Sequence, residues 1–417
     1  MVVPVQGEVA VAVTDNKKAQ PTTGQALAAL GAAALAIPGI VSEANAAAPL
    51  AEASFDYKYS AYREADLDRN KLGGGSPKRF EIDSHMLRFA APAGTQSDIA
   101  VDLSFETLSG ASPWFILPGS GDSGPVQIMS GASIKEERKD VQLTATHYFD
   151  KQWSLAVVGG YSTENDYEAV NVGAALDLEQ AESQRTYSAG FGYSDDTLEP
   201  TDGRALADRV DRAAKTSLNT FVGVSQIINA RTVVQGSLSY AVHDGYLSDP
   251  YKKYWVVDQS NTFADSRPDE RTPVVVEAKL RHFVPGAKAA LHLDYRFFDD
   301  NWEVTSHTVD AAWYQNLPGG WMLTPSLRYY TQTQAHFYAP YFFTARSDGL
   351  GSSDYRLSPY GAISARLMAS KDWGGLTTQL EWESYRASAD YSLEEVALEN
   401  PALVEFDILT LGIHWKL

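Results

Sequence analysis

The last nine residues of the chain constrain its fold more than any other segment. The apolar residues Leu409, Leu411, Ile413, Trp415 and Leu417 alternate without a break with Thr410, Gly412, His414 and Lys416. A period of two indicates a β-strand whose two faces meet different surroundings. A water-soluble sheet with one buried face would show the same pattern. However, an apolar outer face that ends near a Trp is typical of the last strand of an outer-membrane barrel.

The same alternation recurs along the chain and predicts sixteen strands. In the segment 97–108, for example, Val101 and Leu103 share one face, and Asp102 and Ser104 lie on the other. The predicted strands are 52–64, 80–91, 97–108, 133–149, 153–163, 167–179, 183–195, 216–229, 231–245, 271–284, 287–299, 302–316, 321–333, 355–370, 374–388 and 403–417. Fourteen or eighteen strands are the alternatives to this count.

Connections of two lengths separate these strands. The short ones are 92–96, 150–152, 180–182, residue 230, 285–286, 317–320 and 371–373. The long ones are 65–79, 109–132, 196–215, 246–270, 334–354 and 389–402, and the same set includes the short connections 164–166 and 300–301. This pattern predicts a single all-β domain, a transmembrane antiparallel β-barrel with short periplasmic turns and long extracellular loops. The soluble alternative is a propeller or two sandwiches, but the chain shows no blade-length repeat.

Length and composition limit the function of such a barrel. At 417 residues the chain is too short for a plugged receptor of about twenty-two strands. A net charge of −19 argues against binding to nucleic-acid phosphates. The absence of Cys excludes disulfides and thiolate metal sites. The 22 Tyr residues suit a membrane interface, because Tyr combines an apolar ring with a polar hydroxyl group.

Residues 1–46 are predicted to be a secretory signal peptide with an N-terminal extension, and residues 47–417 to be the barrel domain. Lys17-Lys18 precedes a largely apolar run from Ala26 to Val41, and Ala44-Asn45-Ala46 offers small residues for cleavage. The alternative is a transmembrane anchor, but the run is short, rich in Ala and interrupted by Pro38-Gly39. The expected location is therefore the outer membrane of a Gram-negative bacterium.

Charged residues of both signs recur on the strand faces predicted to point inward. The candidate lumen-lining residues are Glu277, Lys279, Arg281, His292, Asp294, Arg296, Asp310, Arg328, Arg366, Glu381 and Glu383. One interpretation is a pore lining that selects solutes. The other is an interior that neutralising pairs hold together and even fill. The mixed signs predict no strong preference for anions or cations, and a barrel of this size admits an aqueous channel unless loops fill it.

The long loops are acidic, but the chain contains no D-x-D-x-D-G sequence for Ca²⁺ and no His-x-x-x-His pair, so we expect no metal site and no cofactor. His243-Asp244 lies at the loop end of a strand, where it is a candidate for an Asp/His site. Without a Gly-x-Ser-x-Gly sequence it does not predict an enzyme. Arg267, Asp269, Glu270 and Arg271 are predicted to form an ion-pair cluster that folds the 246–270 loop over the mouth. The alternative is that this loop is an external binding surface.

Five segments in order carry a resemblance to a known family. They are Glu106–Trp114, Asp244–Lys252, Arg267–Thr272, Leu291–Arg296 with Asp300-Asn301-Trp302, and Trp313-Tyr314-Gln315. Over residues 50–417 the chain resembles the family known as domain of unknown function 3570, found in Gram-negative bacteria. The resemblance implies an outer-membrane protein of unsettled role. Genes of the family often lie beside periplasmic redox and flavin-attachment proteins, which implies a partner in envelope electron transfer or metal handling. The resemblance supplies no catalytic residues.

The leading functional hypothesis is therefore a channel or transporter for a small solute or ion. The alternatives are a non-transporting scaffold that docks periplasmic or surface partners and, more remotely, a rim-site hydrolase. The expected partners are outer-membrane lipid, the barrel-assembly machinery through the C-terminal strand, and a periplasmic protein. The sequence leaves the solute and the oligomeric state open.

Overall fold

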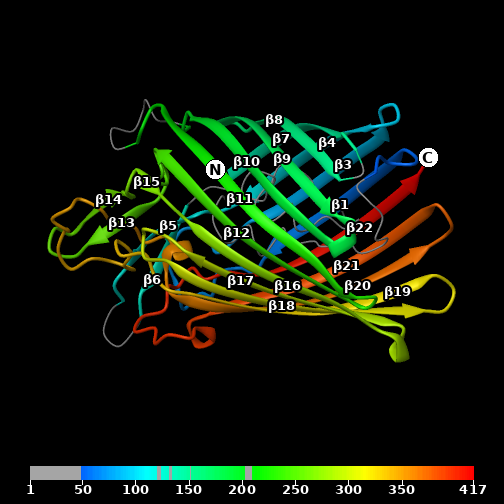
Figure 1. Cartoon of the computed structure of the whole chain (residues 1–417). Coiled ribbons are helices and arrows are strands. Elements are labelled where there is room, and N and C mark those ends of the chain that lie inside the picture. Colours follow the sequence, from blue (N-terminus) through cyan, green and yellow to red (C-terminus); the bar gives the residue numbers. More distant parts are fainter. Residues whose placement is uncertain (1–47, 120–123, 131–133, 151, 202–208) are drawn as a thin grey trace.

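The computed structural model describes residues 48–119, 124–130, 134–150, 152–201 and 209–417, and most of them form one closed antiparallel β-barrel (Figure 1). The barrel has sixteen long strands, as predicted. They are β1 (Ser54–Glu64), β3 (Glu81–Pro92), β4 (Ser97–Gly110), β7 (Ile134–Tyr148), β8 (Trp153–Thr163), β9 (Tyr167–Gln180), β10 (Arg185–Leu198), β11 (Ala213–Asn229), β12 (Thr232–Gly245), β16 (Val274–Val284), β17 (Ala289–Asp299), β18 (Thr305–Leu317), β19 (Trp321–Gln332), β20 (Tyr360–Asp372), β21 (Leu376–Ser388) and β22 (Glu405–Lys416).

The first and last strands close the barrel. β1 pairs with β22 along its whole length, from Ser54 opposite Lys416 to Glu64 opposite Phe406, and pairs with β3 on its other side. Every neighbouring pair of the sixteen strands is antiparallel. Closure matters because an open edge would leave unpaired backbone groups facing lipid.

The two faces of the strands differ as the alternation predicts. On β22, Leu409 and Leu411 are 45% and 48% exposed, whereas Thr410 between them is 2% exposed. On β4, Ile99 and Phe105 are exposed and Asp102 is buried. The outward face is therefore apolar and the inward face polar, which is the arrangement of a barrel in lipid. No helix within the described residues is long and apolar enough to span a membrane.

The connections differ in length at the two ends of the barrel. The turns at the end where β1 begins and β22 ends are short, and two contain single 3₁₀ turns, η2 (Ala181–Ser183) and η3 (Pro285–Ala287). The long loops at the other end contain β2 (Leu72–Gly74), β5 (Pro113–Leu117), β6 (Val126–Met129), β13 (Lys253–Val256), β14 (Asn261–Ala264), η4 (Tyr355–Leu357) and η5 (Ala389–Tyr391). A two-residue strand, β15 (Glu270–Arg271), pairs with the end of β12. The β13–β14 hairpin lies beyond the barrel wall at this loop end (Figure 1).

Several predicted strands begin later than the alternation indicates, and in two of them an Asp side chain explains the difference. The segment 302–304 belongs to a turn, because Asp300 Oδ1 accepts hydrogen bonds from the backbone N–H groups of Trp302 (2.9 Å) and Val304 (3.0 Å). Residues 355–357 form η4, where the Asp354 side chain accepts from the Arg356 N–H. In both places an Asp side chain competes with the strand ladder for backbone donors. The predicted signal peptide, residues 1–46, lies outside the described residues.

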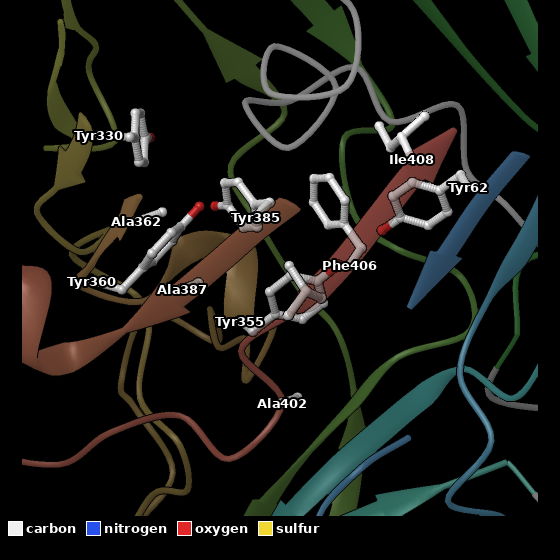
Figure 2. Packing of buried hydrophobic residues seen from close by; sticks show 11 residues of the cluster. Tyr62, Tyr330, Tyr355, Tyr360, Ala362, Tyr385, Ala387, Ala402, Phe406 and Ile408 are labelled. Atoms are coloured by element: carbon white, nitrogen blue, oxygen red, sulfur yellow. The ribbon is translucent and has the colours of Figure 1, made fainter. Parts of the chain in front are cut away.

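An aromatic cluster occupies the inward side of the barrel at the loop end (Figure 2). It brings together Tyr62, Tyr330, Tyr355, Tyr360, Ala362, Tyr385, Ala387, Ala402, Val404, Phe406 and Ile408. The Tyr385 and Phe406 rings stack with their centroids 4.5 Å apart. Because Tyr355 and Ala402 come from loops, this cluster anchors two long loops onto the inward faces of β1 and β19–β22.

Candidate functional site

The eleven predicted lumen-lining residues lie on the inward faces of β16–β21. Several are already ion-paired. Lys279 Nζ lies 3.3 Å from Glu277 Oε2, and Arg281 pairs with Asp294 across the β16–β17 ladder. The Asp310 carboxylate receives both Arg328 (3.1 Å) and Arg366 (3.3 Å).

The remaining candidates make other contacts on the same wall. The His292 ring packs against Tyr314 with centroids 4.2 Å apart, and the Arg296 guanidinium lies over the Phe298 ring. Glu383 accepts a hydrogen bond from Ser364, and Glu381 is buried beside it on β21. The wall carries five acids and five bases, not counting His292, and is therefore electrically balanced. That these residues line a solute path stays a prediction.

The wall formed by β8–β11 has a different composition. Its inward residues are mostly small and uncharged, such as Ser154, Ser162, Ser188, Ser194 and Ser217, which are all buried. With β15 left aside, β8–β10 lie eight strands from β19–β21 in the order of the barrel and face them, whereas β16–β18 face β3, β4 and β7. The interior therefore has one bulky, ion-paired side and one side lined by small polar groups.

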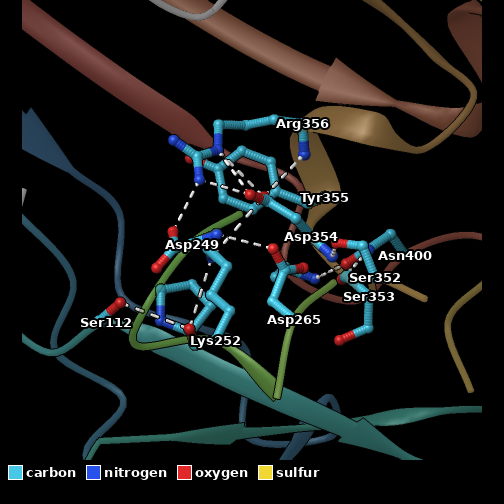
Figure 3. Close-up of polar contacts among 12 residues, drawn as sticks. Ser112, Asp249, Lys252, Asp265, Ser352, Ser353, Asp354, Tyr355, Arg356 and Asn400 are labelled. Atoms are coloured by element: carbon cyan, nitrogen blue, oxygen red, sulfur yellow. Dashed lines mark hydrogen bonds and ion pairs between the residues drawn. The ribbon is translucent and has the colours of Figure 1, made fainter. Parts of the chain in front are cut away.

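Six charged loop residues form a network at the loop end of the barrel, which we call the loop cluster: Asp249, Lys252, Asp265, Arg267, Asp354 and Arg356 (Figure 3). Asp354 is at its centre, with Arg267 Nη2 at 2.9 Å, Lys252 Nζ at 3.6 Å, and Arg356 bound through both its Nε and Nη2. Asp249 pairs with Arg356 at 3.0 Å and Asp265 with Arg267 at 2.6 Å. The loop cluster therefore contains three acidic and three basic side chains, and their formal charges cancel.

Burial and neighbouring charge shift the pKa values within the loop cluster in opposite directions. Burial disfavours the charged form of Asp354, but the Arg356, Lys252 and Arg267 charges outweigh it and hold the pKa of Asp354 well below its usual range. The pKa of Lys252 is lowered, chiefly by burial. The Asp354 carboxylate is thus the fixed charge on which the three cations depend.

The loop cluster joins opposite sides of the mouth. The Tyr251 hydroxyl donates to Asp166 in the β8–β9 turn (2.5 Å), whereas the adjacent Lys252 reaches Asp354 in the β19–β20 loop. Lys252 also donates to the Pro113 carbonyl in the β4–β7 loop. Asn400, in the β21–β22 loop, donates to the Tyr338 hydroxyl (2.9 Å). The loops therefore form one connected layer across the mouth.

The prediction that ion pairs fold the 246–270 loop is right in kind, but its four residues do not form one cluster. Arg267 pairs with Asp265 and Asp354, whereas Arg271 pairs with Asp300. Asp269 and Glu270 use backbone carbonyls instead, which accept from the Gly245 N–H and Trp302 Nε1. Partners such as Asp354 lie too far along the chain for sequence spacing to reveal them.

His243, next to Asp244, is the residue that the sequence offered as a candidate for a catalytic Asp/His site. Its Nδ1 lies 2.8 Å from Ser217 Oγ on the neighbouring strand, so the rim does bring a His and a Ser together. Arg271 pairs opposite His243, and this cation opposes the protonated ring that a general base must form. In the described part of the chain, no three His, Asp or Glu side chains converge as metal ligands.

The sequence did not single out a group of carboxylates near the loop end of β4 and β7 and in the β8–β9 turn: Glu106, Glu136, Asp140, Glu164 and Asp166. The alternation of Glu136, Arg138 and Asp140 on one face of β7 was an available signal. The rest depends on strand neighbours that the sequence does not give.

Comparison with known structures finds other barrels at low identity. The siderophore receptor PirA from Pseudomonas aeruginosa is 9% identical, with a TM-score of 0.41, covering 82% of this chain and 57% of the receptor. The siderophore receptor PirA from Acinetobacter baumannii is 9% identical, with a TM-score of 0.43, covering 82% of this chain and 53% of the receptor. CdiB from Acinetobacter baumannii is 8% identical, with a TM-score of 0.47, covering 88% of this chain and 60% of CdiB. The chain thus spans little more than half the length of these proteins.

No curated protein sequence matches this chain. The model of one protein family does match, over residues 27–400, and its description is "Protein of unknown function (DUF3570)". Because this match covers most of the 417 residues, the chain belongs to the DUF3570 family.

Proposed function

We propose that the chain is an outer-membrane channel or transporter for a small solute or ion. The observation that carries this proposal is the polar inward surface, with ion pairs on β16–β21 and small polar residues on β8–β11. A barrel that conducted no solute would gain more stability from an apolar interior, because buried ion pairs contribute little net stability.

The loop cluster makes the proposed pathway a restricted one. Its charges tie the long loops together above the barrel, so that entry from the loop side requires passage beside them or their rearrangement. We therefore propose a selective or gated pathway in place of a wide general-diffusion pore. The balanced charges of the β16–β21 wall predict little ion preference from that wall alone.

The second candidate is a non-transporting scaffold that docks a periplasmic or surface partner, including a partner from a redox or metal-handling system. The observation that favours it is the loop-end closure, where the aromatic cluster and the loop cluster both pack loops against inward faces. A layer held by buried charges also suits a fixed docking surface.

Single-channel conductance of the purified protein in planar bilayers separates the two candidates. Reproducible conductance steps, with a stable reversal potential in a salt gradient, are expected for the channel. The Asp354→Asn variant should raise the open probability, because it weakens the loop cluster. Silence from protein that shows the heat-dependent gel mobility of a folded barrel, in both forms, would overturn the channel proposal and leave the scaffold. Cross-linking in intact cells then tests for the partner.

A further inference from the structure

The first part of the β21–β22 loop folds back along the outside of the barrel. We call residues 389–399 the outer loop, which Figure 1 draws in orange-red beside the wall at the loop end. The Tyr329 hydroxyl donates to the Tyr391 carbonyl (2.6 Å), and the Leu393 N–H donates to Thr331 Oγ1 (3.1 Å). These two hydrogen bonds tie the outer loop to β19.

The positions that the outer loop touches belong to the outward faces of the strands. Thr331 is in phase with Leu327, which is exposed on the outward face of β19. Gly361 is in phase with the exposed Ile363 on β20, and a Cβ at Gly361 would collide with the Tyr391 carbonyl. Thr331 is nevertheless only 3% exposed, because the outer loop covers it. The outer loop therefore lies on the side of the wall that faces lipid.

The apolar belt of the barrel ends at this height. On β21 the exposed Trp382 is followed on the same face by Arg386, which pairs with Glu405 (3.1 Å) and Asp407 (3.3 Å) on β22. Ile363, directly opposite Arg386 in the β20–β21 ladder, is still apolar. A change from apolar to charged outward side chains marks the edge of the lipid around a barrel. The outer loop thus starts where the headgroups of the lipid begin.

The outer loop presents apolar side chains at this edge. Leu393 is 69% exposed, and Tyr391 and Leu398 are exposed as well. The next residues after Leu393, Glu394 and Glu395, are also exposed and keep a charged group beside it. Segments that lie in a membrane interface combine such residues, because Leu and Tyr enter the boundary between headgroups and acyl chains while the charges stay in water.

Glu399 holds the outer loop in this shape. Its Oε2 accepts hydrogen bonds from the Ala389 N–H (2.9 Å) and from Ser388 Oγ (3.3 Å), so the two ends of the outer loop are fastened together. Its Oε1 lies 2.6 Å from Lys71 Nζ in the β1–β3 loop. A loop that is already closed loses little conformational entropy when its tip binds.

We propose that the outer loop is an interfacial membrane anchor, which binds the lipid leaflet at the loop end of the barrel. Leu393 enters the boundary between headgroups and acyl chains, and Glu394 and Glu395 remain among the headgroups. The partner is lipid because the outer loop continues the apolar belt of the wall on which it rests. This role is separate from the proposed transport and holds for a closed barrel as well. Asn400, the next residue, belongs to the loop layer, so the anchor fixes that layer to the membrane.

The test uses a nitroxide label on single cysteines, since the chain contains no Cys. The full-length protein is placed in phosphatidylcholine nanodiscs, and collisions of the label with oxygen, which concentrates in lipid, and with a water-soluble nickel chelate are measured. Phe343→Cys is the matched control, because Phe343 is 71% exposed but lies beside the β13–β14 hairpin, beyond the barrel wall. Leu367→Cys, on the outward face of β20, is the lipid reference. The ratio of oxygen to nickel collisions for Leu393→Cys should exceed that for Phe343→Cys at least about threefold and approach that for Leu367→Cys.

A second measurement needs no label. Leu393→Ser should speed proteolytic cleavage of the outer loop in nanodiscs by about tenfold, because less apolar surface holds it on the lipid, whereas Phe343→Ser should leave that cleavage unchanged. Equal cleavage in Leu393→Ser and the wild type would overturn the anchor. So would equal collision ratios for Leu393→Cys and Phe343→Cys. Low collision with both reagents, together with dipolar broadening between labels, would also overturn it and assign Leu393 to a contact between two copies of the chain.

Discussion

Neutralising Asp354 tests whether the loop cluster holds the loop layer together. In the Asp354→Asn variant the cluster keeps its three cations, Lys252, Arg267 and Arg356, and only two of its three acids. The Asn side chain still accepts the Arg356 N–H, so the cap of η4 survives and the change isolates the charge. Removal of one member of a buried ion pair costs about 3–5 kcal/mol, because the partners remain buried without compensation.

This cost should appear as faster local opening of the loops. At about 1.4 kcal/mol per tenfold change, the lower bound of 3 kcal/mol corresponds to roughly a hundredfold rise in the open population. Hydrogen exchange reports it directly at two amides. Ser266 and Gly351 donate to each other's carbonyls, at 2.9 and 2.8 Å, across the two loops that the loop cluster joins. Their exchange should accelerate about a hundredfold, whereas amides in the barrel strands should not change.

Asp348→Asn is the matched control, since it removes the same charge from an exposed pair with Arg346 in the same loop. An exposed pair contributes little, so exchange at Ser266 and Gly351 should stay as in the wild type. Unchanged exchange in folded Asp354→Asn would refute the reasoning. So would equal acceleration in the barrel strands, because the charge would then stabilise the whole barrel and not the loop layer.

Four further results are expected. Because burial raises the pKa of Glu164 to about 8 from an unfolded value of 4.5, the neutral form is favoured on folding and the free energy of unfolding should fall as pH rises from 4.5 to 8. The loss is about 3 kcal/mol at pH 7, and urea unfolding should show a flatter profile in Glu164→Gln. Leu411→Arg places a charge on the outward face and should lower the free energy of unfolding, measured with urea in liposomes, by about 2–4 kcal/mol. A smaller loss would mean that Leu411 does not face lipid. A Cβ at Gly361 would lie 2.0 Å from the Tyr391 carbonyl oxygen, so Gly361→Ala should leave the barrel folded but expose the 389–404 loop to limited proteolysis; an unchanged digestion pattern would contradict the packing of η5. Mass spectrometry of the exported protein should find the signal peptide removed after residue 46, and an intact N-terminus would instead favour the anchor.

The loops at the mouth and the residues beneath them differ in how their charges are arranged. The loop cluster contains three acids and three bases, which suits a structural role, whereas Asp166 lies beside the carboxylate of Glu164. Tyr251 and Lys252 are adjacent in the chain and contact Asp166 and Asp354 respectively. A change at Asp166 therefore has a short path to the loop cluster. The Asp354→Asn and Glu164→Gln variants, combined in one protein, should show changes in the free energy of unfolding that are not additive if the two sites communicate.

The sequence by itself determined the barrel and which way its side chains point. A strand has a period of two, so the alternation of Leu409, Thr410 and Leu411 fixes their faces whatever the neighbouring strands are. The same local rule placed Glu277, Lys279 and the other candidates on the inward face. It failed at 302–304 and 355–357, where Asp300 and Asp354 take the backbone donors that a strand ladder would use.

Only the tertiary structure decided which charges meet. Lys252 and Asp354 are 102 residues apart in sequence, and Glu106 and Glu164 are 58 apart, so neither contact follows from spacing. Strand register fixes the neighbours on the barrel wall, and the path of each loop fixes the neighbours at the mouth. Ionic energies depend steeply on distance and burial, which the local pattern of a sequence does not contain. The fold was therefore readable from local alternation, whereas the partners within the loop cluster, and the grouping of Glu106 with Glu164, required the closed barrel.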